Sequence, residues 1–263
     1  MKMPNSKLCT ALIGSAILFV QTVSGQTIAE DNFEDAVYST MQFGDNGGSG
    51  LGGLTDLNSS NGGIFGEIGG RVISGSRSLG VWAESGGEQG VGRSLDTPLV
   101  NGTISLDLRF DANTLGGFAG FNLQSSLPGS GFATNELLSV GIDDSTGNNT
   151  IFIGGSAANS IDLGSSLLGS IVNLEIDFDA AAGTYTVGAK FDSSPTFTTA
   201  SGNLQASSTQ VGAIGWGNFN DSGTDTIDLI SDNLIVVPEP ASWALMMIAG
   251  LLSLGMVLLR PGI

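Results

Sequence analysis

The chain has 263 residues, of which 41 are glycine, 25 are acidic, eight are basic and none is histidine. The absence of histidine excludes catalytic pairs in which histidine activates a serine or cysteine, and it excludes zinc and haem sites with histidine ligands. Glycine is about double its usual share of ~7%, but glycine and proline together make up 48 of 263 residues, below the ~25–30% typical of disordered tracts, so we expect a folded chain with many tight turns.

Residues 1–25 have the pattern of a secretory signal peptide. Lys2 and Lys7 form a basic start, an apolar stretch follows, and small residues lead up to Gly25. The apolar stretch is too short to cross a bilayer core of ~30 Å. We expect cleavage after Gly25, with Ala29 as the alternative position. Either cut removes the single cysteine, Cys9, and leaves an exported domain without a thiol.

Residues 26–236 form the expected exported domain, which carries 24 acidic and five basic residues. Its net charge of −19 would repel phosphate backbones, so we expect no binding to nucleic acid. Segment 44–63 contains eight glycines in 20 residues. We expect this segment to be a long loop, either mobile or wrapped across the domain.

Apolar residues alternate with polar ones along much of this domain, as is typical of strands with one buried face. The clearest runs are 103–110, 172–179 and 184–191, and the last two are predicted to form a hairpin. Further strands are expected at 71–83, 117–124, 136–142, 150–153, 210–216 and 226–237. The sequence therefore predicts an all-β domain, an antiparallel β-sandwich or jelly roll.

Two tryptophans lie outside the C-terminal segment, Trp82 and Trp216, and both are candidates for stacking on sugar rings. Gly215 and Gly217 flank Trp216 and would either expose its ring or let it pack inside the domain. Packing in the core is the competing interpretation.

Two polar loops are candidates for a structural calcium site. Asp143 and Asp144 lie in one loop and Asp221 and Asp225 in another, and Ca²⁺ prefers such hard oxygen ligands. Neither loop has a fixed calcium-binding spacing, and aspartate is also an ordinary turn residue. No other cofactor is expected.

An acidic strand is the main catalytic candidate. Glu175, Asp177 and Asp179 alternate, so they share one strand face, and retaining glycosidases use two carboxylates about 5–5.5 Å apart. The string 175–179 is similar to the core motif of laminarinase-like jelly-roll hydrolases, but the final glutamate of that motif is missing. A solvated strand face explains the same residues. We therefore expect no enzyme activity and keep a glycan-active hydrolase using Glu175 and Asp177 as the alternative.

The C-terminal segment, 237–263, begins with Val237, Pro238, Glu239 and Pro240. Two prolines that bracket one residue end regular structure and hold the chain extended. Residues 241–259 follow, 19 residues without a charge, which is the length of a transmembrane helix.

Arg260 follows this apolar stretch and favours the cytoplasmic side of a membrane. The tetrapeptide, the apolar helix and the basic residue together resemble the PEP-CTERM sorting signal, although the family usually ends in several arginines. The resemblance implies that exosortase, a membrane-embedded cysteine enzyme of Gram-negative bacteria, reads this segment. It also implies anchoring in the inner membrane, then delivery to the cell surface or extracellular matrix, where exopolysaccharide is a partner.

The exported domain resembles the concanavalin-A/laminin-G-like sandwiches found in many PEP-CTERM proteins. The segments that carry this resemblance are 31–34, 47–50, 76–79 and 228–236. In such folds the first and last strands often pair. The resemblance implies a cell-envelope protein that is adhesive or glycan-binding and not an enzyme.

Overall fold

The computed structural model describes residues 26–39, 41–111, 116–206, 208–221 and 227–239. Within them, Thr27–Val237 form one compact unit. The signal peptide predicted at 1–25 and the helix predicted at 241–259 lie outside the described residues. Among the residues that are described, no helix is long and apolar enough to cross a membrane.

The described part of the chain is all-β, apart from one short 3-10 helix, η1 (Ala36–Ser39). Its strands are β1 (Ala29–Asp31), β2 (Thr55–Glu67), β3 (Ser78–Leu99), β4 (Asn101–Asp111), β5 (Gly117–Gln124), β6 (Glu136–Asp143), β7 (Thr150–Gly154), β8 (Ala158–Asp162), β9 (Ile171–Asp179), β10 (Thr184–Phe191), β11 (Thr198–Asn203), β12 (Val211–Asn220) and β13 (Ile227–Pro238).

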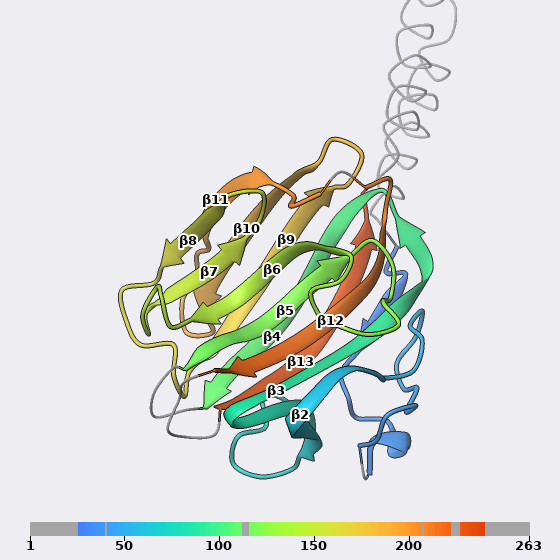
Figure 1. Ribbon diagram of the computed structural model, residues 1–263, viewed down its shortest axis with the longest axis vertical. Helices are drawn as coiled ribbons and strands as arrows, with labels where there is room; N and C mark the ends of the chain where they lie inside the picture. Colours follow the sequence, from blue (N-terminus) through green and yellow to red (C-terminus); the bar gives the residue numbers. More distant parts are fainter. Residues whose placement is uncertain (1–25, 40, 112–115, 207, 222–226, 240–263) are drawn as a thin grey trace, which may run out of the picture. The chain divides into compact units, whose positions relative to one another are not determined.

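These strands form an antiparallel sheet that folds into two layers (Figure 1). The back sheet has the order β11-β10-β9-β4-β13 and continues into the first part of β3. The front sheet starts with the second part of β3 and has the order β12-β5-β6-β7-β8. β3 joins the two layers, because residues 79–83 pair with β13 and residues 87–94 pair with β12. β2 runs along the other side of β3.

The alternating runs predicted as strands are strands, and their apolar residues fill the space between the layers. Ile104, Ile176 and Val187, from three neighbouring strands of the back sheet, are fully buried. The hairpin predicted between the runs 172–179 and 184–191 is confirmed as β9 and β10. β1 pairs with β13, so the expected pairing of the first and last strands is also confirmed.

Two local predictions are wrong. Residues 71–77 were expected to start a strand, but β3 begins at Ser78 and then runs well past residue 83, to Leu99. The expected loop 44–63 ends early, because β2 starts at Thr55. Glycines occupy many positions of β2 and β3, so these strands lack the usual alternation of apolar and polar residues. The sequence did not predict β8 and β11, because they are short and polar.

Candidate functional site

Three phenylalanine rings lie together on the outer face of the front sheet. Phe118 of β5 is opposite Phe219 of β12, and their ring centroids are 6.5 Å apart. The ring of Phe152, on β7, lies 6.2 Å from that of Phe118. All three side chains are half-buried, whereas Phe121 and Trp216 on the inner face are fully buried. The front sheet therefore presents an aromatic surface outward.

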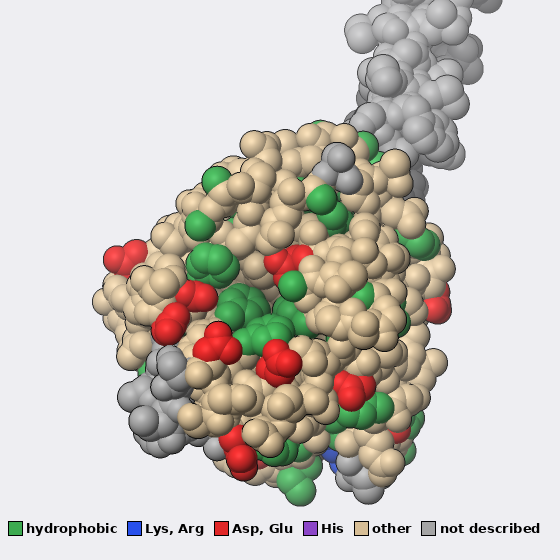
Figure 2. Space-filling view, viewed as in Figure 1, with side chains coloured by type: hydrophobic (Ala, Val, Ile, Leu, Met, Phe, Trp, Pro, Cys, Tyr) green, Lys and Arg blue, Asp and Glu red, His purple; other side chains and the backbone are tan. Residues whose placement is uncertain are grey.

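Glycines form the floor beside these rings. Gly90 of β3, Gly217 of β12, Gly120 of β5 and Gly141 of β6 lie opposite one another across four strands. The backbones of β5 and β6 approach so closely that a Cβ atom on Gly141 would lie 2.1 Å from the carbonyl oxygen of Ala119. Only glycine fits there. Figure 2 shows the resulting hollow, with hydrophobic side chains gathered in it.

The connection between β5 and β6, residues 125–135, lies over one part of this glycine row, and we call it the strap. Its Phe132 is only 2% exposed and packs against Gly90 and Gly217. The Phe132 ring centroid lies 5.3 Å from that of Phe219, so the strap extends the aromatic row. Gly131 fixes the strap to the edge strand, because its N–H donates to the carbonyl oxygen of Leu57 at 2.6 Å.

The polar side chains beneath the strap donate hydrogen bonds to other groups of the protein. The side-chain amides of Asn122 and Gln124 are fully buried and donate to the carbonyl oxygen of Phe132 at 3.2 and 2.8 Å. Glu136 accepts from Asn122 at 3.3 Å and from Gln205 at 2.5 Å. Burial raises the pKa of Glu136, and the hydrogen bonds that it accepts only partly offset this effect. The side-chain oxygens of Asn122 and Gln124 have no partner among the described residues.

Carboxylates stand at both ends of the pair of rings formed by Phe118 and Phe219. Glu88 of β3 is opposite Phe219, and Asp143 of β6 is opposite Phe118. Both carboxylates are half-buried. Along this row the order is therefore carboxylate, ring, ring, carboxylate, and Figure 2 shows acidic side chains beside the hollow.

The loops predicted to bind calcium meet at the same place. The Asp144 N–H donates to the carbonyl oxygen of Gly117 at 3.3 Å. Gly117 is also paired with Asn220, the residue directly before Asp221. Asp143 Oδ1 accepts from the N–H of Ser145 at 2.9 Å, as in an ordinary turn. Asp225 lies outside the described residues. The described part of the chain contains no group of three acidic, histidine or cysteine side chains that could hold a metal ion, and the calcium site stays a prediction.

The basic side chains lie elsewhere. Of those in the described ranges, Arg93 is fully buried, Arg71 and Arg77 lie in the loop after β2, and Arg109 and Lys190 lie on β4 and β10 of the back sheet. In Figure 2, Lys and Arg show only at the lower edge of the view. The field over the hollow is therefore negative, so it attracts cations and repels anions.

Trp216 is not the sugar-stacking platform considered from the sequence. Its side chain is fully buried, and its indole Nε1 donates to Ser231 Oγ at 2.9 Å. Its ring packs edge-on against Phe33 and Phe121, with centroids 6.0 and 5.6 Å away. The flanking glycines serve the opposite face of β12, where they leave room for Phe132.

The remaining candidates do not lie on the front sheet. Trp82 is half-buried on β3, with its indole against Gly63 of β2. Glu175 and Asp177 point outward from β9 in the back sheet, where Glu175 is exposed and Asp177 accepts a 2.6 Å hydrogen bond from Thr103 Oγ1. The structure thus separates the catalytic candidates from the aromatic hollow.

The sorting motif lies at the end of the described chain. β13 ends at Pro238, where Val237 and Pro238 are half-buried, and Glu239 is exposed. Pro240 and Arg260 lie outside the described residues. The sorting signal accordingly stays a prediction.

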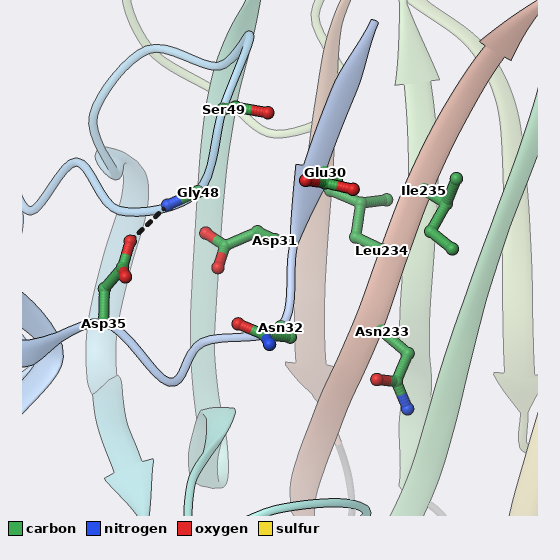
Figure 3. Close-up of a pocket in the computed structure, with 9 residues that line it drawn as sticks. All are labelled: Glu30, Asp31, Asn32, Asp35, Gly48, Ser49, Asn233, Leu234 and Ile235. Carbon is green, nitrogen blue, oxygen red and sulfur yellow. Dashed lines mark hydrogen bonds between the residues drawn. The ribbon is translucent and has the colours of Figure 1, made fainter. Parts of the chain in front are cut away.

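A second concave site lies where β1 runs beside β13 (Figure 3). It has a volume of about 430 Å³ and is lined by Glu30, Asp31, Asn32, Asp35, Gly48, Ser49, Asn233, Leu234 and Ile235. Asp35 Oδ2 accepts from the N–H of Gly48 at 2.7 Å, and Asp31 forms an ion pair with Arg93. Asp35 therefore holds the glycine-rich loop directly, whereas Asp31 holds Arg93, which in turn bonds to the loop.

Arg93 completes this attachment of the loop. Its guanidinium donates to the carbonyl oxygens of Gly52 and Gly47 at 2.6 and 2.7 Å and to Tyr38 Oη at 3.0 Å. Burial raises the pKa of Tyr38, whose hydroxyl donates to Asp31. Residues 44–54 are thus wrapped against the sandwich, and we assign no ligand to the pocket because its aspartates are engaged within the protein.

The aromatic row escaped the sequence analysis because its members come from three separate strands. One signal was present: Phe118 and Phe219 occupy outward positions next to residues that face the core, such as Ala119. An apolar ring at an outward position of an alternating strand indicates a binding surface or a covering segment.

Comparisons with known proteins do not identify a family. No family model matches the chain, and no curated protein matches it. Solved structures that it resembles include lectin II from Ulex europaeus (12% identity, 70% of this chain and 97% of that chain, TM-score 0.46) and peanut lectin (14%, 70% and 97%, TM-score 0.43). The Lotus tetragonolobus seed lectin is similar at 11% identity, over 75% of this chain and 96% of that chain, with a TM-score of 0.45. A likeness this low carries no argument about function.

Proposed function

We propose that this chain is an exported envelope protein whose sandwich domain binds glycan on its front sheet without cleaving it. One observation carries the proposal: in a glycine-floored hollow the half-exposed ring of Phe118 contacts those of Phe219 and Phe152, and a carboxylate stands at each end of the Phe118–Phe219 pair. Apolar rings suit the C–H faces of sugars, and carboxylates accept hydrogen bonds from hydroxyls.

The proposed delivery route rests on the two ends of the sequence. A signal peptide at 1–25 exports the domain, the helix at 241–259 anchors it in the inner membrane, and exosortase processes it near Pro238-Glu239-Pro240. The protein then reaches the cell surface or matrix and its exopolysaccharide. In cells that lack exosortase, we expect a protein of larger apparent mass that stays in the membrane fraction; unchanged size and location would contradict the proposed sorting.

The binding test is a glycan array with the purified full chain, kept in a detergent without sugar headgroups. A reducing-sugar assay runs on every glycan that binds. We expect binding without release of reducing ends. Release that is lost in Glu175→Gln would instead support the hydrolase alternative, and the absence of any glycan signal would contradict the proposed binding.

Calcium is proposed only as a structural addition to this site. If the Asp143–Asp144 turn and Asp221 hold Ca²⁺, a chelator lowers the melting temperature of the purified protein and Asp221→Asn abolishes that response. A melting temperature that chelator does not change would exclude a stabilising calcium ion.

A further inference from the structure

We infer that the ligand of the front-sheet hollow is a glycan that carries free ammonium groups, that is, an amino-sugar polymer or its fragments. This inference rests on the proposed function and narrows it to one chemical class. Three features of the hollow carry it: the kind of hydrogen-bonding group left for a ligand, the distribution of charge, and the order of rings and carboxylates.

The groups with unused hydrogen-bonding capacity at the hollow are acceptors. Glu88 makes no side-chain hydrogen bond or ion pair with the other described residues, and only one oxygen of Asp143 is taken up by its own turn. Beneath the strap, the fully buried side-chain amides of Asn122 and Gln124 donate to the carbonyl oxygen of Phe132, so they add no donor to the surface of the hollow. A ligand that complements this surface must therefore be rich in donors.

The charge around the hollow selects among donor-rich ligands. Glu88 and Asp143 flank the rings, and Asp144 and Asp221 are exposed beside them. The basic residues of the described chain lie in the core, in the loop after β2 or on the back sheet. Uronic acids would be repelled and neutral sugars would gain nothing from this field, whereas an ammonium group is attracted to it.

The order of groups suits an ammonium carried on a sugar. The rings of Phe118 and Phe219 are 6.5 Å apart, and a carboxylate stands opposite each of them on the neighbouring strand, Asp143 on β6 and Glu88 on β3. A sugar ring that lies on the phenylalanines therefore has its substituents next to Glu88 or Asp143. An ammonium there gains both a carboxylate and the face of a ring, because cations are attracted to aromatic faces.

The experiment compares two ligands that differ in this group alone. Calorimetric titrations of the full chain use oligomers of β-1,4-linked glucosamine and the same oligomers after N-acetylation. We expect the free amine to bind at least about tenfold more tightly at low salt, and the difference to shrink towards ~1 M salt as charges are screened.

Variants locate the effect. Glu88→Gln and Asp143→Asn should each weaken binding of the amine form by about three- to fivefold and leave the N-acetylated form unchanged. Asp192→Asn removes the same charge from an exposed turn after β10 of the back sheet, and should change neither affinity. Circular dichroism melts check that each variant is folded, so a loss of binding is not a loss of structure.

The possible outcomes separate this inference from the proposed function. Equal affinity for the two oligomers would overturn the inference but not glycan binding. Spermidine binding as tightly as the glucosamine oligomer would also overturn it, because charge alone would then suffice. If neither oligomer binds while the array shows another glycan, the inference fails alone; if no glycan binds at all, the proposed function fails with it.

Discussion

The front and back sheets bury the same kind of residue inside but present different surfaces outside. On the back sheet, outward positions pair polar groups across strands, as Asp177 does with Thr103. On the front sheet, the outward positions of β5 and β12 include glycines and phenylalanines, such as Phe118, Gly120, Gly217 and Phe219. The comparison shows that inward alternation determines the layers, whereas the outward residues determine where a ligand can bind.

Removing an aromatic ring should lower the stability of the protein when the ring packs on the front sheet, but not when it lies beside the back sheet. Phe132→Ala removes a ring that is 2% exposed and should lower the free energy of unfolding by about 3 kcal/mol. Phe197→Ala removes a ring that is 39% exposed and contacts Lys190, and should change it by less than about 0.5 kcal/mol. Urea denaturation measures both. Similar losses would mean that the strap is not packed as described.

Replacing a glycine by alanine should also destabilise the front sheet more than the back sheet, but by less than the loss of the Phe132 ring. A Cβ on Gly141 meets the backbone of β5, so Gly141→Ala should cost about 2 kcal/mol. The nearest atoms to a Cβ on Gly188 of the back sheet belong to the partly exposed Phe197 side chain, from 3.2 Å, and this side chain can move. Gly188→Ala should therefore be neutral or slightly stabilising, by up to about 0.5 kcal/mol. A neutral Gly141→Ala would show that the glycine floor is not required.

The smallest effect concerns pH. The pKa of Glu136 is raised in the folded state because the carboxyl is buried, so its ionised form is disfavoured there. Stability from this group is greatest below its ordinary pKa of 4.5 and falls as pH rises through and above that value. Glu136→Gln should raise the free energy of unfolding at pH 7, and this gain should disappear at pH 3, where the carboxyl is protonated in both states.

Melting temperatures of the parent and Glu136→Gln across this range measure the effect. Curves that stay parallel would contradict it. Asp232, buried beside β3, also has a raised pKa, because burial outweighs its hydrogen bonds, and Asp232→Asn tests the same effect away from the hollow.

The sequence was informative where one face of a strand is apolar and the other polar. β4, β9 and β10 were predicted from that pattern, because their burial follows it residue by residue. β2 and much of β3 were not, because a glycine such as Gly90 gives no polar alternation. The hollow could not be predicted, since cross-strand register brings Phe118, Phe152 and Phe219 together.

The candidate sites show the same division. From the sequence, the indole of Trp216 could be either exposed between its glycines or packed in the core. It is packed in the core, because those glycines face outward and the indole faces inward. Asp143 and Asp144 were chosen as calcium ligands from composition. Their position beside the aromatic hollow depends on the pairing of β5 with β6, which composition does not specify.

The most direct test of the front-sheet site is a comparison of two ring-removing variants on one glycan. Calorimetry with the strongest binder from the array measures the affinity of the parent, of Phe118→Ala/Phe152→Ala and of Phe197→Ala. We expect the front-sheet double variant to lose at least about tenfold in affinity and the back-sheet variant to match the parent. Parent affinity in the double variant, or its loss in Phe197→Ala alone, would contradict a glycan site on the front sheet.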